Sequence, residues 1–307
     1  MQLPTGITLF ERGWLSSNNI LLRGKNGCAL IDSGYATHAT QTLGLLTVAL
    51  QGQPLDLLLN THLHSDHCGG NAALQARYPR LQTWIPPGHA RFVTPWNPEA
   101  LSYLPTGQIC PSFGFSATLQ PNTEIALGDQ LWQIHAAPGH DPHSVILFEP
   151  QSGLLISADA LWQNGFGVVF PELDGADAFA EVAQTLDVIE ALAPRIVIPG
   201  HGAPFSDVAG ALARARRRLD SFVQAPHKHI RYAAKVLLKF KLLEVQSIPL
   251  ADLMQWAQAT PLLQQIYPSC AAPDQSFQDW VLALLDELVR SGAASRDQQT
   301  VSNDNSA

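Results

Sequence analysis

The stretch THLHSDH, residues 61–67, places three histidines and one aspartate within six residues. It directly follows the apolar run at residues 55–60, whose composition predicts a short buried strand. Neutral imidazole and carboxylate groups are the ligands that Zn²⁺ and related divalent ions take in proteins. A loop at a strand end can direct the first two histidines one way and the aspartate and last histidine another. The stretch therefore predicts a site for two adjacent metal ions.

Three later apolar runs are followed by a side chain of the same kind. His140 stands in a Pro-Gly-His turn, Asp159 ends the run LLISAD, and His201 stands in a second Pro-Gly-His turn. Each signal is weak by itself, because a lone Pro-Gly-His is more often a turn with a solvated histidine. The three in order after residues 61–67 indicate further metal ligands. His143, three residues after His140, either lines the site or belongs to a turn.

Together these motifs resemble the metallo-β-lactamase superfamily of hydrolases over about residues 5–205. The resemblance implies an α+β fold, a four-layer αββα sandwich, and the run at residues 61–71 is most similar to the glyoxalase II-like branch. By position, the ligands of the first metal are His62, His64 and His140. Those of the second metal are Asp66, His67 and His201, and Asp159 matches the carboxylate that bridges the two metals.

The motif LIDSG, residues 30–34, also matches an early motif of that family. The resemblance implies that Asp32 lies behind the metal ligands, where a carboxylate can orient a metal-bound imidazole. The alternative is that Asp32 caps a turn before the following helix.

The resemblance implies two divalent metal ions, with zinc expected and iron or manganese as alternatives. Two such ions share a water and lower its pKa, so that a metal-bridging hydroxide can attack an ester, thioester or lactone. Asp66 is then both a ligand and the catalytic residue that accepts a hydrogen bond from the hydroxide. Cys68 is interpreted as a small buried residue. The C-terminal region lacks the glutathione-contacting pattern of glyoxalase II, so the small-molecule substrate stays open.

The composition indicates a globular chain of 307 residues, 46% hydrophobic and 14% charged. Disorder needs low hydrophobicity and high charge, so a mainly disordered chain is excluded. No run of about 18 apolar residues occurs, so neither a membrane-spanning helix nor a membrane partner is expected. The four cysteines form no CxxC pair and the N-terminus shows no signal-peptide pattern, which favours a reducing, cytoplasmic location.

The sequence predicts three regions. Residues 1–205 form the catalytic domain. Residues 206–290 carry helical patterns broken at prolines and predict an all-helical C-terminal region, with a winged-helix arrangement as one option. The polar tail, residues 291–307, is expected to be disordered. Residues 86–122 show little periodicity and predict a long irregular insert, whose role the sequence does not define.

A basic stretch gives the runner-up function, an endoribonuclease or phosphodiesterase of the same superfamily. Residues 214–241 hold nine of the 18 lysines and arginines, although the formal net charge of the chain is −8. Helical spacing places four of them on one face: Lys228, Arg231, Lys235 and Lys239. This face either attracts an anionic substrate, nucleic acid included, or is simply solvated. The overall acidity makes nucleic acid the less favoured partner, and the oligomeric state is not indicated.

Overall fold

The computed structural model describes residues 3–304 of the chain. These residues group into two compact units: residues 3–101 with Ile109–Asp220, and Ser102–Gln108 with residues 221–304. The sequence places the boundary earlier, between residues 205 and 206. The difference arises because most of helix α8 (Val208–Gln224) groups with the first unit.

The first sheet of the first unit has six strands in the order β1-β2-β3-β4-β5-β6. Strands β1 to β3 pair antiparallel, and β3 to β6 pair parallel. Their bounds are Ile7–Phe10, Asn19–Gly24, Gly27–Ile31, Leu57–Leu59, Gln82–Ile85 and Ala117–Thr118.

Alternating side chains in β2 show how this sheet is covered on both faces. Ile20 and Leu22 belong to the core between the two sheets, whereas Leu21 joins a second cluster with Leu46 and Leu50. Successive side chains of a strand point to opposite faces, so a continuous apolar run suits a strand buried on both sides. Leu46 and Leu50 come from helix α1 (Ala39–Leu50), which with α3 (Asn71–Arg77) packs on the outer face.

The second sheet has five strands in the order β11-β10-β9-β8-β7. Only the pair β10 and β11 is parallel among these strands. In chain order the bounds are Thr123–Leu127, Gln130–Ala136, Val145–Glu149, Leu154–Ala158 and Ile196–Pro199. The fully buried Trp132 of β8 and Leu147 of β9 pack against the first sheet in the shared core.

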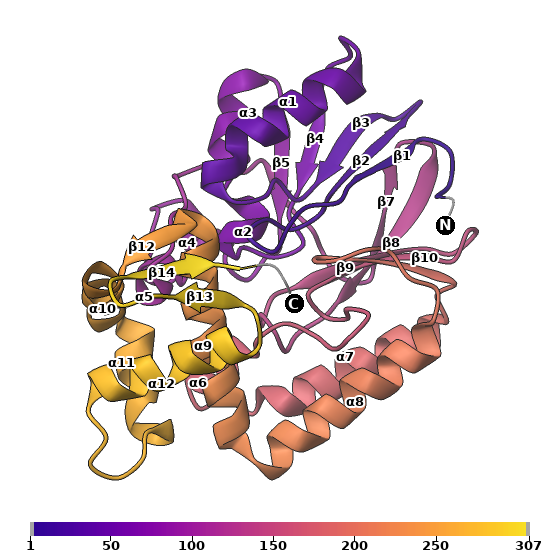
Figure 1. The fold of residues 1–307 in the computed structure, drawn as a ribbon. Coiled ribbons are helices and arrows are strands. Elements are labelled where there is room, and N and C mark those ends of the chain that lie inside the picture. Colours follow the sequence, from indigo (N-terminus) through magenta and orange to yellow (C-terminus); the bar gives the residue numbers. More distant parts are fainter. Residues whose placement is uncertain (1–2, 305–307) are drawn as a thin grey trace. The chain divides into compact units, whose positions relative to one another are not determined.

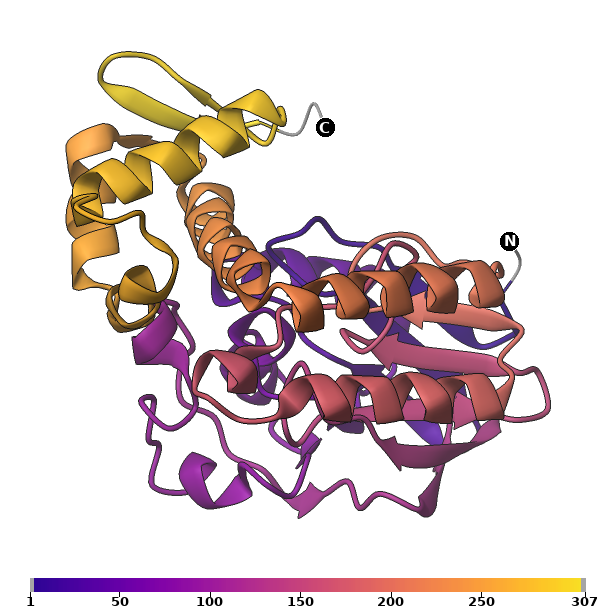
Figure 2. The ribbon, with the colours of Figure 1, turned by 90° about the horizontal axis from the view of Figure 1, so that it is seen from below.

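Two helices cover the outer face of the second sheet, namely α7 (Ala178–Leu192) and α8 (Figures 1 and 2). Phe179, Val182 and Leu186 recur at helical spacing in α7 and are buried. The first unit thus consists of helices, sheet, sheet and helices. The predicted four-layer αββα sandwich is confirmed.

The region from residue 86 to residue 122 is more structured than an irregular insert. It contains α4 (Ala90–Val93), α5 (Tyr103–Thr106) and β6, and α5 belongs to the second unit. The remaining short elements of the first unit are η1 (Ala36–His38), α2 (Ser65–Cys68) and α6 (Phe170–Leu173).

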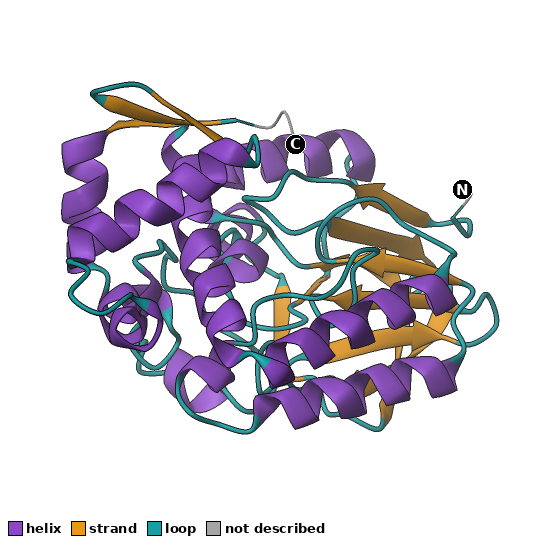
Figure 3. Cartoon of the chain, turned by 60° about the horizontal axis from the view of Figure 1, so that its bottom comes forward, coloured by secondary structure: helices purple, strands orange, loops and turns teal. Residues whose placement is uncertain are grey.

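The second unit contains the helices predicted for the C-terminal region and, in addition, a small sheet (Figure 3). Its helices are α9 (Pro226–Val245), α10 (Leu250–Ala259), α11 (Pro261–Cys270) and α12 (Phe277–Arg290). Strands β12 (Ser247–Pro249), β13 (Ala294–Arg296) and β14 (Thr300–Asn303) pair in the order β12-β14-β13. The disordered tail predicted for residues 291–307 is therefore wrong for β13 and β14, whose backbone groups pair with each other and with β12. Residues 305–307 lie outside the described residues.

The basic side chains of α9 are bound within the second unit. Arg231 and Lys235 both contact Glu287 of α12, Lys235 with an Nζ–Oε2 distance of 3.0 Å. Lys239 Nζ donates to the carbonyl oxygens of Ala293 and Asp304 and to Asn303 Oδ1. The four residues of the predicted face all lie on α9, and each already contacts an oxygen, since Lys228 Nζ lies 3.5 Å from Ser221 Oγ. Among the described residues, no helix is long and apolar enough to cross a membrane.

Candidate metal centre

The seven side chains predicted as metal ligands lie in two neighbouring groups. Each follows a buried strand of one of the two sheets, directly or after a short turn. The strands and the residues that follow them are β4 with His62, His64, Asp66 and His67; β8 with His140; β10 with Asp159; and β11 with His201. Buried strands fix where these loops begin, so residues far apart in sequence converge.

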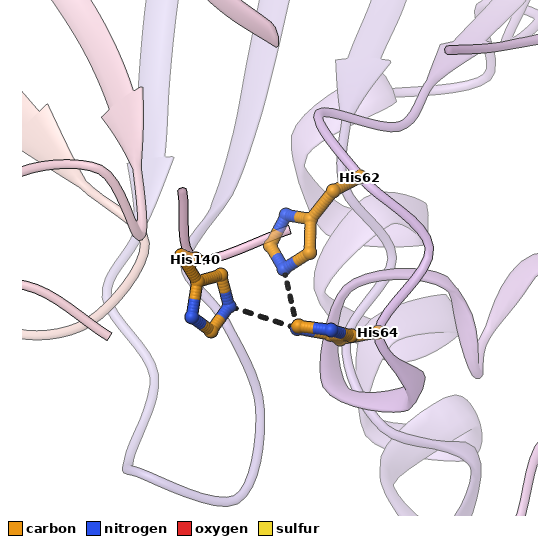
Figure 4. Close-up of side chains that lie close together, drawn as sticks. All are labelled: His62, His64 and His140. Atoms are coloured by element: carbon orange, nitrogen blue, oxygen red, sulfur yellow. Dashed lines mark hydrogen bonds between the residues drawn. The ribbon is translucent and has the colours of Figure 1, made fainter. Parts of the chain in front are cut away.

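The first group consists of His62, His64 and His140, whose rings meet edge-on (Figure 4). His62 Nε2 lies 3.0 Å from His64 Nδ1, and the same Nδ1 lies 2.8 Å from His140 Nε2. Burial together with the neighbouring His140 lowers the pKa of His64 to about 3. Burial and the surrounding imidazoles likewise lower the pKa of His62 well below its usual value. Unprotonated imidazole nitrogens that converge in this way can bind a divalent cation.

The second group consists of Asp66, His67, Asp159 and His201. Asp66 Oδ2 lies 3.0 Å from His201 Nε2 and 3.8 Å from His67 Nε2. Burial by itself would raise the pKa of Asp66, but His67 and His201 outweigh it and lower that pKa. The group therefore presents ionised carboxylates beside His67, whose pKa Asp32 and these carboxylates raise well above its usual value against the effect of burial.

Asp159 connects the two groups through a single oxygen atom. Its Oδ2 lies 3.4 Å from His140 Nε2, 3.5 Å from His67 Nε2 and 3.7 Å from His201 Nε2. Burial opposes ionisation, but His201 and His67 outweigh it and hold the pKa of Asp159 well below its usual value. A carboxylate that reaches both groups in this way can bridge two cations.

Asp32 orients His67 from behind. Asp32 Oδ1 accepts a hydrogen bond from Thr61 N, and Oδ2 accepts from Thr61 Oγ1 and from His67 Nδ1, the last at 2.8 Å. A carboxylate can only accept, so Nδ1 carries the proton and Nε2 is left to face Asp159. Asp32 adopts a positive φ of 58°, a conformation that suits a fixed turn, but its carboxylate does more than cap that turn.

His67 Nε2 provides the test of whether a metal fits. In the part of the chain that the structure describes, this atom is buried and has no hydrogen-bond partner. It lies 3.5 Å from Asp159 Oδ2 and 3.8 Å from Asp66 Oδ2, so a cation bound there would have imidazole nitrogen and carboxylate oxygen as ligands together. The donor set of imidazole nitrogens and carboxylate oxygens is the one that zinc and related ions prefer. The residues present therefore fit two divalent ions.

Three residues near the first group were missed or left open by sequence reasoning. Asp141 is buried, and its Oδ2 lies 3.9 Å from His64 Nε2 and 3.7 Å from His89 Nδ1. The ring of His143 packs edge-on against His89 with a centroid distance of 4.6 Å. Asp141 directly follows His140, so a buried acid next to a ligand was the available signal. His143 thus belongs to a polar cluster beside the first group.

Cys68 is buried behind the ligands, as expected for a small core residue. Its Sγ contacts the carbonyl oxygen of His64 at 3.3 Å and lies 3.8 Å from the Sγ of Cys110. No sequence pattern indicates this proximity, because 41 residues separate the two cysteines.

Comparison with known proteins identifies similar chains. A family model described as "Metallo-beta-lactamase superfamily" matches residues 12–201. A hydroxyacylglutathione hydrolase of Anaeromyxobacter dehalogenans is 29% identical over 228 residues, which cover 71% of this chain and 77% of that protein. An acyl-coenzyme A thioesterase of Gallus gallus is 26% identical over 223 residues, 64% of this chain and 79% of that protein.

Other hydroxyacylglutathione hydrolases match over a smaller part of their length. The matched regions are 40% of the protein from Synechococcus sp. (strain JA-3-3Ab) and 54% of the protein from Trichormus variabilis. Among solved structures, a metallo-beta-lactamase family protein from Thermus thermophilus superposes with a TM-score of 0.57 at 20% identity. That superposition covers 98% of this chain and all of the other, and it shows a shared fold.

Proposed function

The chain belongs to the metallo-β-lactamase superfamily of hydrolases, and from this premise we propose that it is a metal-dependent hydrolase of acyl thioesters. The family predicted from the sequence is confirmed. The observation that carries the proposal is the position of Asp159 Oδ2, which lies within 3.7 Å of imidazoles from both ligand groups.

The proposed ligand assignment follows the two groups. His62, His64 and His140 would hold one ion, and Asp66, His67 and His201 would hold the other, with Asp159 shared. When bound, two divalent ions supply an activated water and a positive charge that polarises the acyl carbonyl. We propose zinc as the resident metal, because it takes imidazole nitrogen and carboxylate oxygen readily.

Asp66 is the proposed catalytic side chain of the protein itself. Its Oδ2 faces His201 Nε2 at 3.0 Å, which leaves Oδ1 to accept a proton from the attacking water. The lowered pKa of Asp66 keeps this carboxylate ionised at neutral pH, as an acceptor must be. Asp32 holds His67 in one orientation, so the position of its Nε2 is set before a metal or substrate binds.

The choice of a thioester is supported by the relatives and by leaving-group chemistry. One relative is named for hydrolysis of an acylated glutathione and another for hydrolysis of an acyl-coenzyme A thioester. A thiol has a pKa near 8.5, so it can leave as a thiolate without a positioned general acid. An alcohol leaving group, as in an ester or lactone, needs more help with its proton.

We rank the runner-up activity on RNA or other phosphodiesters below thioester hydrolysis. It rested on the basic stretch, whose Arg231, Lys235 and Lys239 are bound to oxygens of the second unit. Helix α12 adds three acidic residues against one arginine, which suits nucleic acid poorly.

The test is a substrate panel with the zinc-loaded protein of 307 residues. Acyl-coenzyme A and acyl-glutathione thioesters are compared with oxoesters of the same acyl group, a lactone, and bis(4-nitrophenyl) phosphate. Released thiol is followed with a disulfide reagent and released acid by pH-stat. We expect kcat/KM to be highest for a thioester. A higher value for the lactone or for the phosphodiester would overturn the proposed substrate class while leaving the metal site intact.

A further inference from the structure

We propose that Trp162 is a positioning residue that fixes the carboxylate of Asp159, an inference that rests on the metal site proposed above. The indole Nε1–H of Trp162 donates to Asp159 Oδ1 at 3.1 Å. The other oxygen, Oδ2, is the one that faces His140, His67 and His201. The two oxygens of the Asp159 carboxylate thus have different partners. The indole of Trp162 holds Oδ1, and Oδ2 faces both ligand groups.

The backbone around Trp162 holds the indole in place. Trp162 N donates to Gly165 O at 2.7 Å, which closes a tight turn in which Gly165 has a φ of 124°. One residue earlier, the carbonyl of Leu161 accepts a hydrogen bond from the buried Ser157 Oγ at 2.7 Å. The turn is therefore fixed on both sides of the tryptophan, so the indole donor has little freedom to move away from Asp159.

Two further rings hold the indole ring itself. Trp162 packs edge-on against His201 with a centroid distance of 5.7 Å and edge-on against Trp14 at 5.3 Å. Trp14 in turn stacks on His201 at 5.3 Å with an interplanar angle of 9°. Aromatic pairs in these geometries add roughly 0.5–1.5 kcal/mol beyond their buried area. These three contacts connect Trp162, which holds Asp159, with His201, which belongs to the second group.

Gly200 shows how closely Asp159 is confined on another side. A Cβ atom added at Gly200 would lie 2.1 Å from Asp159 Oδ1 and 3.1 Å from His67 Cε1. Asp159 itself is only 4% exposed. Loss of the indole N–H would leave Oδ1 buried against Gly200 without this donor, and the carboxylate would be free to turn. Oδ2 would then no longer be presented to both groups in one fixed geometry.

The test compares zinc binding in Trp162→Phe and Trp14→Phe. Trp162→Phe removes the N–H and keeps an aromatic ring, and we expect zinc binding weakened by about 10–100-fold, as for other groups that orient a metal ligand. Trp14→Phe is the matched control, because it changes a ring of the same cluster that makes no hydrogen bond to Asp159. Since phenylalanine keeps a ring that can stack on His201, the zinc affinity of Trp14→Phe should fall less than that of Trp162→Phe. Affinity is measured by competition with a chromophoric chelator, so the readout does not depend on turnover.

The outcomes separate this inference from the proposed metal site. Unchanged zinc affinity in Trp162→Phe, or an equal loss in Trp14→Phe, would overturn the role of the indole N–H and leave the metal site standing. An unaltered protein that binds no zinc would overturn both. Thermal unfolding of the metal-free variants checks that each one folds. Should Trp162→Phe fail to fold, Trp162→Leu, which also has no side-chain hydrogen-bond donor, must show the same loss of affinity or the inference fails.

Discussion

The two ligand groups differ in charge, and the difference decides how each one takes up a cation. The first group contains three imidazoles and no acid, and burial keeps His62 and His64 unprotonated. The second group contains Asp66 and Asp159 and is backed by Asp32. One group is neutral because protonation is disfavoured, and the other is balanced by opposite charges in contact.

Proton competition follows from this difference. Burial disfavours a charged His67, yet Asp32, Asp159 and Asp66 outweigh burial and raise its pKa well above the usual value. In the metal-free protein, a cation entering the second group must displace this proton. A cation entering the first group meets His62 and His64 already unprotonated. The comparison therefore predicts two positions with different sensitivity to substitution and to pH.

The largest effect is expected where the two groups meet. Asp159→Asn keeps the size of the side chain and removes the charge that faces His140, His67 and His201. We expect both metal positions to weaken, and kcat/KM to fall by roughly 10³-fold, within the range for a positioned group. Elemental analysis and thioester turnover measure the two effects. Asp141→Asn is the matched control, a buried acid outside both groups, and should keep two metal equivalents. If Asp159→Asn also bound two metal equivalents at unchanged affinity, Asp159 would not connect the two ligand groups.

A smaller and one-sided effect is expected for Asp66→Asn. Asp66 contacts His201 and His67 of the second group, so its loss should release one of two metal equivalents and spare the first group. Turnover should fall by at least about 100-fold, because both a ligand and the proton acceptor are weakened. Metal content and turnover are measured on the same preparation. Retention of two equivalents with near-full activity would contradict both roles given to this residue.

The candidate site could be predicted from the sequence because its residues follow recognisable strands. His140, Asp159 and His201 each come after an apolar run, and such a run fixes both the strand and the place where its loop begins. Asp32, which directly follows β3, was predicted instead from the resemblance of residues 30–34 to a family motif. Partners set by side-chain packing were not visible. Nothing in the spacing of Trp162 shows that its indole reaches Asp159, or that Trp14 stacks on His201.

The second unit was harder to predict because its signals are weak or misleading. Prolines 261 and 268 both indicate breaks; helix α10 does end at Ala259 and α11 (Pro261–Cys270) begins at Pro261, but α11 runs through Pro268. Pro261 lies in the first turn, where a missing N–H costs nothing, and Pro268 lies near the C-terminal end. Strands β13 and β14 are short and polar, and β14 pairs with β12 some fifty residues earlier in the chain. Composition cannot indicate a pairing of that kind.

The pH dependence of metal binding sharpens the comparison of the two groups. His67 carries a proton below its raised pKa, so the affinity of the second group should fall about tenfold for each pH unit lowered through that region. The pKa of His64 is about 3, so this residue adds no proton competition near neutral pH. Calorimetric titration in buffers of different ionisation enthalpy measures the protons released by each zinc equivalent between about pH 6 and 8, the range in which an ordinary imidazole titrates. If the first and the second zinc equivalent released the same number of protons, the assignment of a protonated His67 to the second group would be wrong.

The smallest effect is expected outside both groups, on the basic face of α9. Lys235 Nζ lies 3.0 Å from Glu287 Oε2, and Arg231 also contacts that carboxylate, so Lys235→Gln leaves Glu287 paired. The side chains are about one-third exposed, and the stability cost should be under about 1 kcal/mol. Lys228→Gln is the matched variant from the same face, since its Nζ contacts Ser221 Oγ at 3.5 Å.

Both lysine variants should retain two metal equivalents and an unchanged salt dependence of kcat/KM. Salt weakens the attraction between an exposed charge and an anionic substrate. If this face attracts the substrate, the lysine substitutions should lower kcat/KM most at low ionic strength. The measurement compares an acyl-coenzyme A thioester with an uncharged thioester of the same acyl group, at low and at physiological salt. Suppose that kcat/KM for the charged substrate falls in Lys228→Gln but not in Lys235→Gln. Lys228, which has no carboxylate partner among the described residues, would then be the residue that attracts the substrate. A loss in Lys235→Gln would mean that the contact with Glu287 does not neutralise this face. In either case the metal affinities of the two groups should stay as in the unaltered protein, because no ligand or partner of a ligand has been changed.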